Sequence, residues 1–503
     1  MSKQQLSLAR SMGSNLLGEA VLRIPQLMVD LILAQTLQVF EFGVLIGLRT
    51  LLQLVSFLGD VPLVALDVRY AQYVGAGDLE RSRLLAGSAF VATMVLSIAS
   101  VIVIAAGLSV AEIRSALSPG ASVSQCMALL GLVVLQGAYS FLVTHMRNRL
   151  KFNLTNITLL TTNAIYVGLI LYLVPEWRVH GALFAFGLCQ LSCIAVWLFQ
   201  TDLAFGNCRR QLSDLFELCQ MGIGFAAVGM MMTWLRLMSR PAIAYECGVE
   251  SLGVFGVASV FAGAALFAGG STARVIVQLA ARAEGAMTSR AEQAIRFGFV
   301  PGVWVTGISC IACSIVAGGG EFLLPYLSNQ HAAIEPLLLP VCIAGVLHSL
   351  VGFLSSTLRA QCRQRELFTI TACVLLIYTV LLATGCLLDM PLWCFPCLES
   401  IAVVAFVALL VRQLEAPVEE RWRFIRITGL MLFLTISANQ IGVISGEYFC
   451  LSKWLHGVVS IGCGLIAVLL WLPAAVGATG RWTSLQVGAR GGLLTKQETP
   501  HER

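Results

Sequence analysis

A series of long apolar segments constrains this chain more than any other feature of its sequence. A helix needs about 20 apolar residues to cross a bilayer core of about 30 Å. About fourteen stretches of that kind can be placed, at approximately 12–36, 43–68, 84–108, 123–145, 154–174, 180–200, 220–244, 252–278, 294–317, 333–357, 367–388, 392–412, 424–443 and 454–476. Of its 503 residues 58% are hydrophobic and 12% are charged, whereas about 25% are charged in soluble proteins. The sequence therefore predicts an all-α polytopic membrane protein.

The distribution of basic residues predicts how these helices are oriented. Cytoplasmic connections of membrane proteins are enriched in Lys and Arg. If the N-terminus is cytoplasmic, most of the 32 basic residues fall on the inner side, and the outer connections hold only Arg114, Arg178 and Lys453. Both termini are therefore expected in the cytoplasm. The first residues do not show the pattern of a removable signal peptide, and no nucleic-acid-binding face is expected.

An internal repeat at an offset of about 210 residues predicts two related halves. Phe42-Gly43-Val44 matches Leu252-Gly253-Val254, and Phe141-Leu142 matches Phe353-Leu354 after a slip of two residues. The expected organisation is an N-lobe of six helices and a C-lobe of six helices, followed by two extra C-terminal helices. The corresponding ranges are 1–200 for the N-lobe, 201–219 for a cytoplasmic linker, 220–413 for the C-lobe, 414–476 for the extra helices and 477–503 for a flexible cytoplasmic tail.

Polar side chains form a stripe on one face of each of the first two apolar segments. At about 100° per residue, the polar residues of each segment share a helix face; they are Asn15, Glu19, Arg23, Gln26 and Asp30, then Arg49, Gln53, Ser56, Asp60 and Asp67. Because charge facing lipid is strongly disfavoured, the stripes predict a wet cavity between the two helices. Pro25 removes a backbone donor and predicts a kink beside Arg23, which is either static or a hinge.

Five arginines are predicted at membrane depth, and they are the main candidates for substrate binding: Arg23, Arg49, Arg236, Arg240 and Arg274. A guanidinium stays charged and donates paired hydrogen bonds, so it suits a phosphate-bearing anionic headgroup. The alternative is neutralisation by carboxylates, with Glu19 four residues before Arg23 and with Asp30 or Asp60 near Arg49. That alternative is weaker in the second half, where few carboxylates lie within the apolar segments.

Three carboxylates, Glu19, Asp30 and Asp60, are candidates for coupling to H⁺ or Na⁺. Burial and a neighbouring arginine change a carboxylate's proton affinity in opposite directions, so its protonation can follow conformation; fixed ion pairs fit equally well. The sixteen cysteines lie mostly in apolar segments, where Cys behaves as a small hydrophobe. Cys394 and Cys397 are close enough in sequence to oxidise together. No metal site and no other cofactor is predicted.

Several segments resemble the bacterial polysaccharide flippases, the O-antigen and exopolysaccharide transporters of the multidrug/oligosaccharidyl-lipid/polysaccharide (MOP) superfamily. The resemblance lies in Val39-Phe-Glu-Phe-Gly-Val-Leu, Asp60 in the following helix, Tyr70-Ala-Gln-Tyr and Gly77-Asp-Leu-Glu-Arg. Met146-Arg-Asn-Arg-Leu-Lys-Phe and Leu358-Arg-Ala-Gln-Cys-Arg-Gln-Arg resemble the family at equivalent places in the two halves.

The resemblance implies a two-lobed transporter, not an enzyme, in the bacterial inner membrane. Its substrate would be an undecaprenyl-diphosphate-linked oligosaccharide, moved from the inner to the outer leaflet by alternating access and driven by a cation gradient. Partners would be membrane lipids and other polysaccharide-assembly proteins. A lipid II flippase and a drug/cation antiporter of the same superfamily remain alternatives. A membrane polysaccharide polymerase or ligase is a further alternative, although the large outer loop such enzymes use is missing.

Overall fold

A computed structural model describes residues 25–75, 78–110, 118–149, 151–201, 203–205, 208–284, 290–327, 331–361 and 363–448, with short pieces at 461–462, 466, 471–473 and 475–477. In these ranges the regular elements are all helices, which confirms the predicted fold class. After a helix over residues 25–36 come α2 (Val39–Gly75), α3 (Leu79–Ser109), α5 (Val123–Asn148), α6 (Phe152–Leu198), α7 (Cys208–Leu237), α8 (Ser239–Glu246), α9 (Gly248–Glu284), α10 (Arg290–Gln293), η1 (Ala294–Phe299), α11 (Val300–Leu327), α12 (His331–Ala360), α13 (Gln364–Leu387), α14 (Cys394–Gln413) and α15 (Val418–Tyr448).

Within the described residues, nine helices are long and apolar enough to cross a membrane. One of them, Leu154–Leu198, contains two of the predicted spans. The break between these spans lies at Arg178, whose backbone leaves the helical region at φ 49° and ψ −128° shortly after Pro175. Arg178 also donates a hydrogen bond to the Thr36 carbonyl oxygen at 3.1 Å. The predicted outer connection is thus a sharp kink inside α6.

Two other predicted spans begin differently in the structure. The span expected from residue 220 belongs to α7, which begins at Cys208 and is followed after Met238 by the short helix α8. The span expected from residue 294 begins with α10 and a π-helical turn, η1, before α11 continues it. A π turn accommodates an extra residue without ending the helix. Apolar periodicity located these spans but not their caps.

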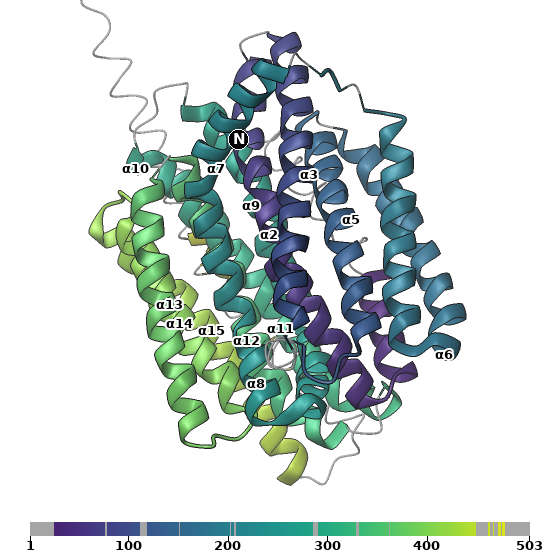
Figure 1. The fold of residues 1–503 in the computed structure, drawn as a ribbon. Coiled ribbons are helices and arrows are strands. Elements are labelled where there is room, and N and C mark those ends of the chain that lie inside the picture. The colour runs from purple at the N-terminus through teal and green to yellow at the C-terminus, as the bar shows by residue number, and fades with distance from the viewer. Residues whose placement is uncertain are drawn as a thin grey trace, which may run out of the picture. The chain divides into compact units, whose positions relative to one another are not determined.

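The described chain divides into two compact units, and the first contains residues 1–261, 324–341 and 364–402. Its central helix is α2, which contacts α3, α5, α6, α7 and α8 (Figure 1). Glycines permit the closest of these contacts: a Cβ on Gly222 of α7 would overlap the Val61 carbonyl oxygen of α2. The surrounding side chains are apolar and buried, including Phe42, Leu48 and Leu66. Helix α2 therefore holds its polar residues at the centre of this unit.

The second unit contains residues 262–323, 342–363 and 403–503. Helices α9 and α12 meet where the Gly269 amide donates to the Ser349 hydroxyl at 2.7 Å, and Ser349 also lies 3.1 Å from the Ser309 hydroxyl. The Phe299 and Phe424 rings stack with centroids 4.9 Å apart. Small residues and stacked aromatics thus bring the helices of this unit together.

The repeat seen in the sequence has structural counterparts within each unit. Phe141 and Leu142 of α5 are fully buried, at 0% exposure, and so are their matched residues Phe353 and Leu354 of α12. The matched residues are therefore equally buried, each pair among the helices of its own unit. The division of the chain into an N-lobe, a linker, a C-lobe and two extra helices stays a prediction.

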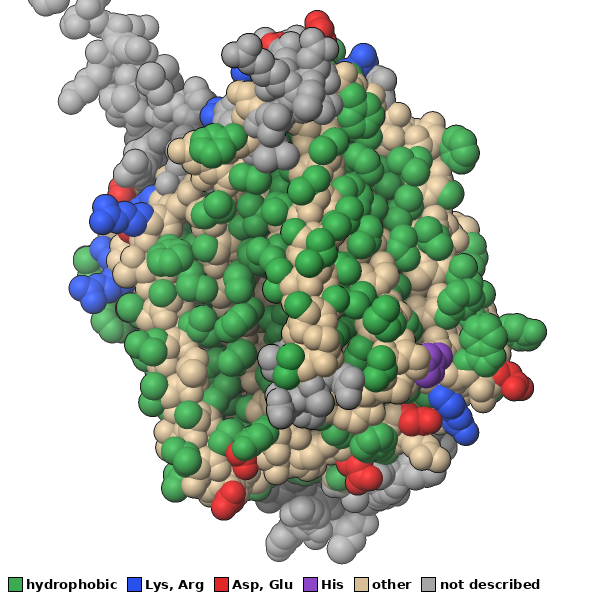
Figure 2. Space-filling view, viewed as in Figure 1, with side chains coloured by type: hydrophobic (Ala, Val, Ile, Leu, Met, Phe, Trp, Pro, Cys, Tyr) green, Lys and Arg blue, Asp and Glu red, His purple; other side chains and the backbone are tan. Residues whose placement is uncertain are grey.

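The outward surface of the helices is apolar, as expected for a chain that lies in lipid. Over α3, α5 and α6, the visible face is mainly hydrophobic and charged side chains lie toward the helix ends (Figure 2). Exposed residues there include Ile102, Val103 and Tyr172. Such continuous apolar exposure is not tolerated by a soluble monomer, so the structure describes a multi-pass membrane protein.

Candidate functional site

An ion pair joins the first two polar stripes. Arg49 of α2 donates to the Asp30 carboxylate at 2.5 Å, and its second terminal nitrogen donates to the Tyr166 hydroxyl of α6 at 3.3 Å. The side chains of Arg49 and Asp30 are 25% and 27% exposed. Of the two carboxylates that the sequence left open for Arg49, the structure selects Asp30. This part of the stripe is thus internally neutralised.

Arg240 of α8, from the second half of the sequence, also contacts α2 beside Arg49. It donates to the Thr50 hydroxyl at 3.0 Å, one residue beyond Arg49 on α2. Within the described residues, no carboxylate lies at ion-pair distance from Arg240. The charges of Arg236, Glu399, Arg49 and Asp30 all act on it. Arg240 is therefore a cation held by a neutral partner, among other arginines.

Glu399 is a site residue that the sequence analysis did not single out. It lies on α14, is 5% exposed, and accepts a hydrogen bond from the Ser239 hydroxyl at 3.3 Å. Its charge also acts on buried Tyr378 of α13. A lone carboxylate inside an apolar segment is a functional candidate by default because burying it is costly. This rule could have identified Glu399 from the sequence. The sequence analysis looked for polar stripes, and Glu399 belongs to none.

The other predicted residues are distributed as follows. Glu19 and Arg23 lie outside the described residues, and so does the side chain of Arg274 on α9. Pro25 is the first residue of the described helix over 25–36, so the predicted kink beside Arg23 also falls outside. Arg236 is exposed on the last turn of α7.

Asp60 is separate from Arg49, Arg236 and Arg240, which together we call the arginine cluster. It lies eleven residues after Arg49 on α2, which at about 1.5 Å per residue is about 16 Å along the helix. Its partner is the Ser140 hydroxyl of α5. Asp30 and Asp60, the two candidate coupling carboxylates that the structure describes, therefore do not form one site.

The two halves also meet at a crossing of α2 and α9. A Cβ on Gly43 would overlap the Val249 carbonyl oxygen, and a Cβ on Gly253 would overlap the Val39 carbonyl oxygen. The offset of 210 residues relates Val39 to Val249 and Gly43 to Gly253, so the contact is symmetric in sequence. This reciprocal contact supports the register of the repeat. We call it the glycine crossing.

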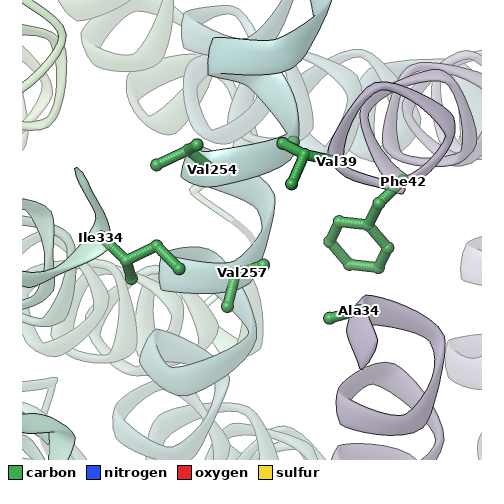
Figure 3. A pocket seen from close by; sticks show the side chains of 7 residues that line it. Ala34, Val39, Phe42, Val254, Val257 and Ile334 are labelled. Carbon is green, nitrogen blue, oxygen red and sulfur yellow. The ribbon is translucent and has the colours of Figure 1, made fainter. Parts of the chain in front are cut away.

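A small apolar pocket lies beside the glycine crossing (Figure 3). Its lining residues are Ala34, Val39, Phe42, Gly253, Val254, Val257 and Ile334. The crossing is at the α2 end that the basic-residue distribution predicts to face outside. The helices are therefore closed against each other there, and the side chains that line the adjoining pocket are apolar.

The arginine cluster is suited to an anion. Arg49, Arg236 and Arg240 gather against the carboxylates of Asp30 and Glu399, so the described side chains carry one positive charge in excess. Like charges held together in a partly dehydrated place are costly, and an anionic ligand relieves that cost. Guanidinium groups favour phosphate oxygens among anions.

Several solved structures of transporters and flippases have a similar fold. A structure titled lipid II flippase MurJ, inward closed conformation, matches at a TM-score of 0.64 with 14% identity, over 92% of this chain and 98% of that chain. An inward-facing multidrug resistance MATE family transporter matches at 0.58 with 14% identity, over 78% and 96%. A MOP superfamily transporter from Pyrococcus furiosus, whose title reports reverse polarity of its binding pocket, matches at 0.57 with 15% identity, over 80% and 95%.

These matches confirm the predicted MOP-type fold, and the matched proteins are transporters and flippases. No protein-family profile matches the sequence. No curated protein sequence matches it either. The substrate must therefore be argued from the site.

Proposed function

We propose that this protein is a flippase that moves an undecaprenyl-diphosphate-linked oligosaccharide from the inner to the outer leaflet of the bacterial cytoplasmic membrane. In this proposal the two halves open alternately to either side, and a cation gradient drives the cycle. Both termini lie in the cytoplasm, and other polysaccharide-assembly membrane proteins supply and receive the substrate.

The observation that carries the proposal is the position of Arg240. It brings a guanidinium from the second half onto α2 of the first half, where its hydrogen-bond partner is the neutral Thr50 hydroxyl. Arg49 lies next to Thr50, and Arg236 acts on Arg240 through its charge. A diphosphate can bridge several guanidinium groups at once. Arg240 is thus available to a ligand in a way that the paired Arg49 is not.

The extent of the structural match supports a lipid-linked substrate over a drug. The match to the lipid II flippase covers 92% of this chain, whereas the match to the MATE transporter covers 78%. A drug/cation antiporter would also favour an acidic cavity for its cationic substrate, and the cluster here has an excess of arginine. The lipid II flippase function is the second candidate, because lipid II shares the polyprenyl diphosphate and differs in its glycan.

The coupling ion is assigned in the proposal to carboxylates near the cluster. Asp30 is paired with Arg49, so binding of a diphosphate to Arg49 would weaken that pair and free Asp30 for H⁺ or Na⁺. Glu399 offers a further buried carboxylate, and Asp60, which lies apart from the cluster, has one buried carboxylate oxygen. Glu19 keeps the coupling role given to it from the sequence.

A flipping assay in proteoliposomes tests the proposal. Full-length protein is reconstituted with a fluorescent undecaprenyl-diphosphate oligosaccharide, and the fraction reached by an external glycosidase is followed over time. Fluorescent lipid II and a cationic dye serve as competing substrates. The proposal expects faster flipping of the oligosaccharide than of the dye, and loss of flipping in Arg240→Ala and Arg236→Ala. Equal rates in protein-free vesicles would refute it.

The driving force is tested in the same vesicles. The proton gradient and the sodium gradient are dissipated separately with selective ionophores. The proposal expects one of the two treatments to slow flipping. If neither has an effect, the coupling roles of Glu19, Asp30 and Asp60 are wrong while the flippase function stands.

A further inference from the structure

A directed chain of hydrogen bonds ends at Asp60. The Gln190 amide of α6 donates to the Gln136 carbonyl oxygen at 2.5 Å, and the Gln136 amide donates to the Ser140 hydroxyl at 3.2 Å. The Ser140 hydroxyl in turn bonds the Asp60 side chain. Each donor points toward Asp60, so side chains of two helices, α5 and α6, orient this carboxylate of α2. No contact of this chain involves the arginine cluster.

Four buried oxygen atoms on the helices around this chain have no hydrogen-bond partner among the described residues. They are Oδ1 of Asp60, Oγ1 of Thr93, Oγ of Ser97 and Oε1 of Gln190. Thr93 and Ser97 of α3 are 0% and 1% exposed. An unsatisfied buried oxygen costs about 1–3 kcal/mol, so a group of them needs a physical reason.

The hydroxyls of Thr93 and Ser97 on α3 do not bond the backbone carbonyl oxygens of their own helix. Buried Ser and Thr in helices commonly donate to the carbonyl oxygen four residues earlier, and Ser100 on the same helix does so to Leu96 at 2.7 Å. Thr93 and Ser97 do not. They lie four residues apart and therefore share a face of α3. The Ser97 hydroxyl oxygen is turned toward α2 and α5 instead.

Two glycines bring Ser97 to the level of Asp60. A Cβ on Gly59 of α2 would lie 2.5 Å from the Ser97 hydroxyl oxygen, and a Cβ on Gly137 of α5 would overlap the same atom. Gly59 precedes Asp60 in the chain, and Gly137 lies one turn before Ser140. The Ser97 hydroxyl thus enters the crossing of α2, α3 and α5, where Asp60 and Ser140 also meet.

These atoms have the chemistry of a cation site. A carboxylate and an amide oxygen can only accept, and a hydroxyl oxygen can accept as well. Hard cations prefer such oxygen ligands. One carboxylate among neutral oxygens matches a single positive charge, and a proton would satisfy only one of the oxygens. Within the described part of the chain, no basic side chain forms an ion pair with Asp60.

We propose that Asp60, Thr93 and Ser97 form a binding site for Na⁺ at the crossing of α2, α3 and α5, with Gln136, Ser140 and Gln190 orienting the carboxylate. The proposal that the site binds Na⁺ does not depend on the proposed transport function. Its use as the coupling ion rests on the proposed function, because only a flippase or another transporter would need it.

Thermal unfolding of the full-length protein in detergent tests the site without any lipid substrate. The melting temperature is measured by tryptophan fluorescence in Na⁺, K⁺ or choline chloride at constant ionic strength. Because a ligand that binds only the folded state stabilises it, we expect Na⁺ to raise the melting temperature by about 2 °C or more over choline. Binding of ²²Na⁺ to the same protein gives the stoichiometry, expected to be one ion per chain at this site.

Variants identify the ligands. Asp60→Asn and Ser97→Ala should lose the sodium response, and Ser100→Ala is the matched control because its buried hydroxyl has a local partner. Asp60→Asn should also melt higher in choline than the original protein, since it removes an unpaired buried charge. If Asp60→Asn does not fold, Ser97→Ala alone decides.

Equal melting temperatures in the three salts, or a sodium response retained by Ser97→Ala, would overturn the inference. A sodium response that is present while the flipping assay fails would overturn the proposed function alone. Flipping that is present without any sodium response would overturn the site alone.

Discussion

Replacing Gly43 with alanine should open the glycine crossing, and the structure sets the size of the effect. The new Cβ would overlap the Val249 carbonyl oxygen and lie 3.1 Å from the Gly253 amide nitrogen, so two helix backbones must separate. Overpacking of this kind costs about 1–3 kcal/mol. Alanine's better helix propensity returns about 0.5–1 kcal/mol. The net loss should be about 0.5–2 kcal/mol, which lowers the population of the closed crossing about 2–30-fold.

Gly47 provides the matched control on the same helix. A Cβ there would lie 3.8 Å from the Leu252 side chain, which is ordinary contact. Gly47→Ala should therefore melt at or above the temperature of the original protein, whereas Gly43→Ala and Gly253→Ala should melt lower. The double variant Gly43→Ala/Gly253→Ala should cost less than the sum of the two, because the first substitution already separates the helices.

Unfolding in detergent and the flipping rate in vesicles are measured on these four variants. The reasoning is refuted if Gly43→Ala is as stable as Gly47→Ala, or if the two crossing substitutions are fully additive. It is also refuted if the crossing variants flip at the original rate, because closure of this end is assumed to be part of the cycle.

Three further predictions concern single side chains. Asp30→Asn should destabilise the protein by about 1–3 kcal/mol because it leaves Arg49 partly buried without its carboxylate, and Asp30→Asn/Arg49→Gln should recover part of that loss in a melting experiment. Glu399→Gln should keep the Ser239 contact but remove a charge that acts on Arg240, so it should change the rate of flipping more than the melting temperature. Burial, with the charge of Glu246, raises the pKa of the Cys247 thiol, so its alkylation followed by peptide mass spectrometry should lag behind a free thiol at neutral pH and catch up only at higher pH.

The sequence predicted the elements of the fold well because apolar length and polar stripes are local properties. The apolar segments gave the described spans, and the stripes left Asp30 or Asp60 as the partner of Arg49, of which the structure shows Asp30. The kink at Arg178 was not expected, since a backbone that leaves the helical region for one residue leaves no composition signal.

The partners of each polar residue required the structure. Spacing shows which residues share a face, but not which helix that face meets. The sequence therefore identified Arg240 as a cation at membrane depth but not Thr50 as its partner. It likewise identified Asp60 but not Ser140 as the partner of Asp60. Glu399 was missed because it stands alone in its segment. The repeat could have located the glycine crossing, because Gly43 and Gly253 were already matched residues.

Measurement of flipping by Arg240 variants tests the central claim most directly. Removing a charged hydrogen-bond donor from a ligand typically costs about 1.5–3 kcal/mol, so Arg240→Ala should slow the initial rate of oligosaccharide flipping at least about 10-fold. Arg365→Ala is the control, because Arg365 is exposed on the first turn of α13. The proposal predicts a large loss for Arg240→Ala, a smaller loss for Arg240→Lys and no change for Arg365→Ala. An unchanged rate in folded Arg240→Ala would contradict the assignment of the arginine cluster as an anion-binding site.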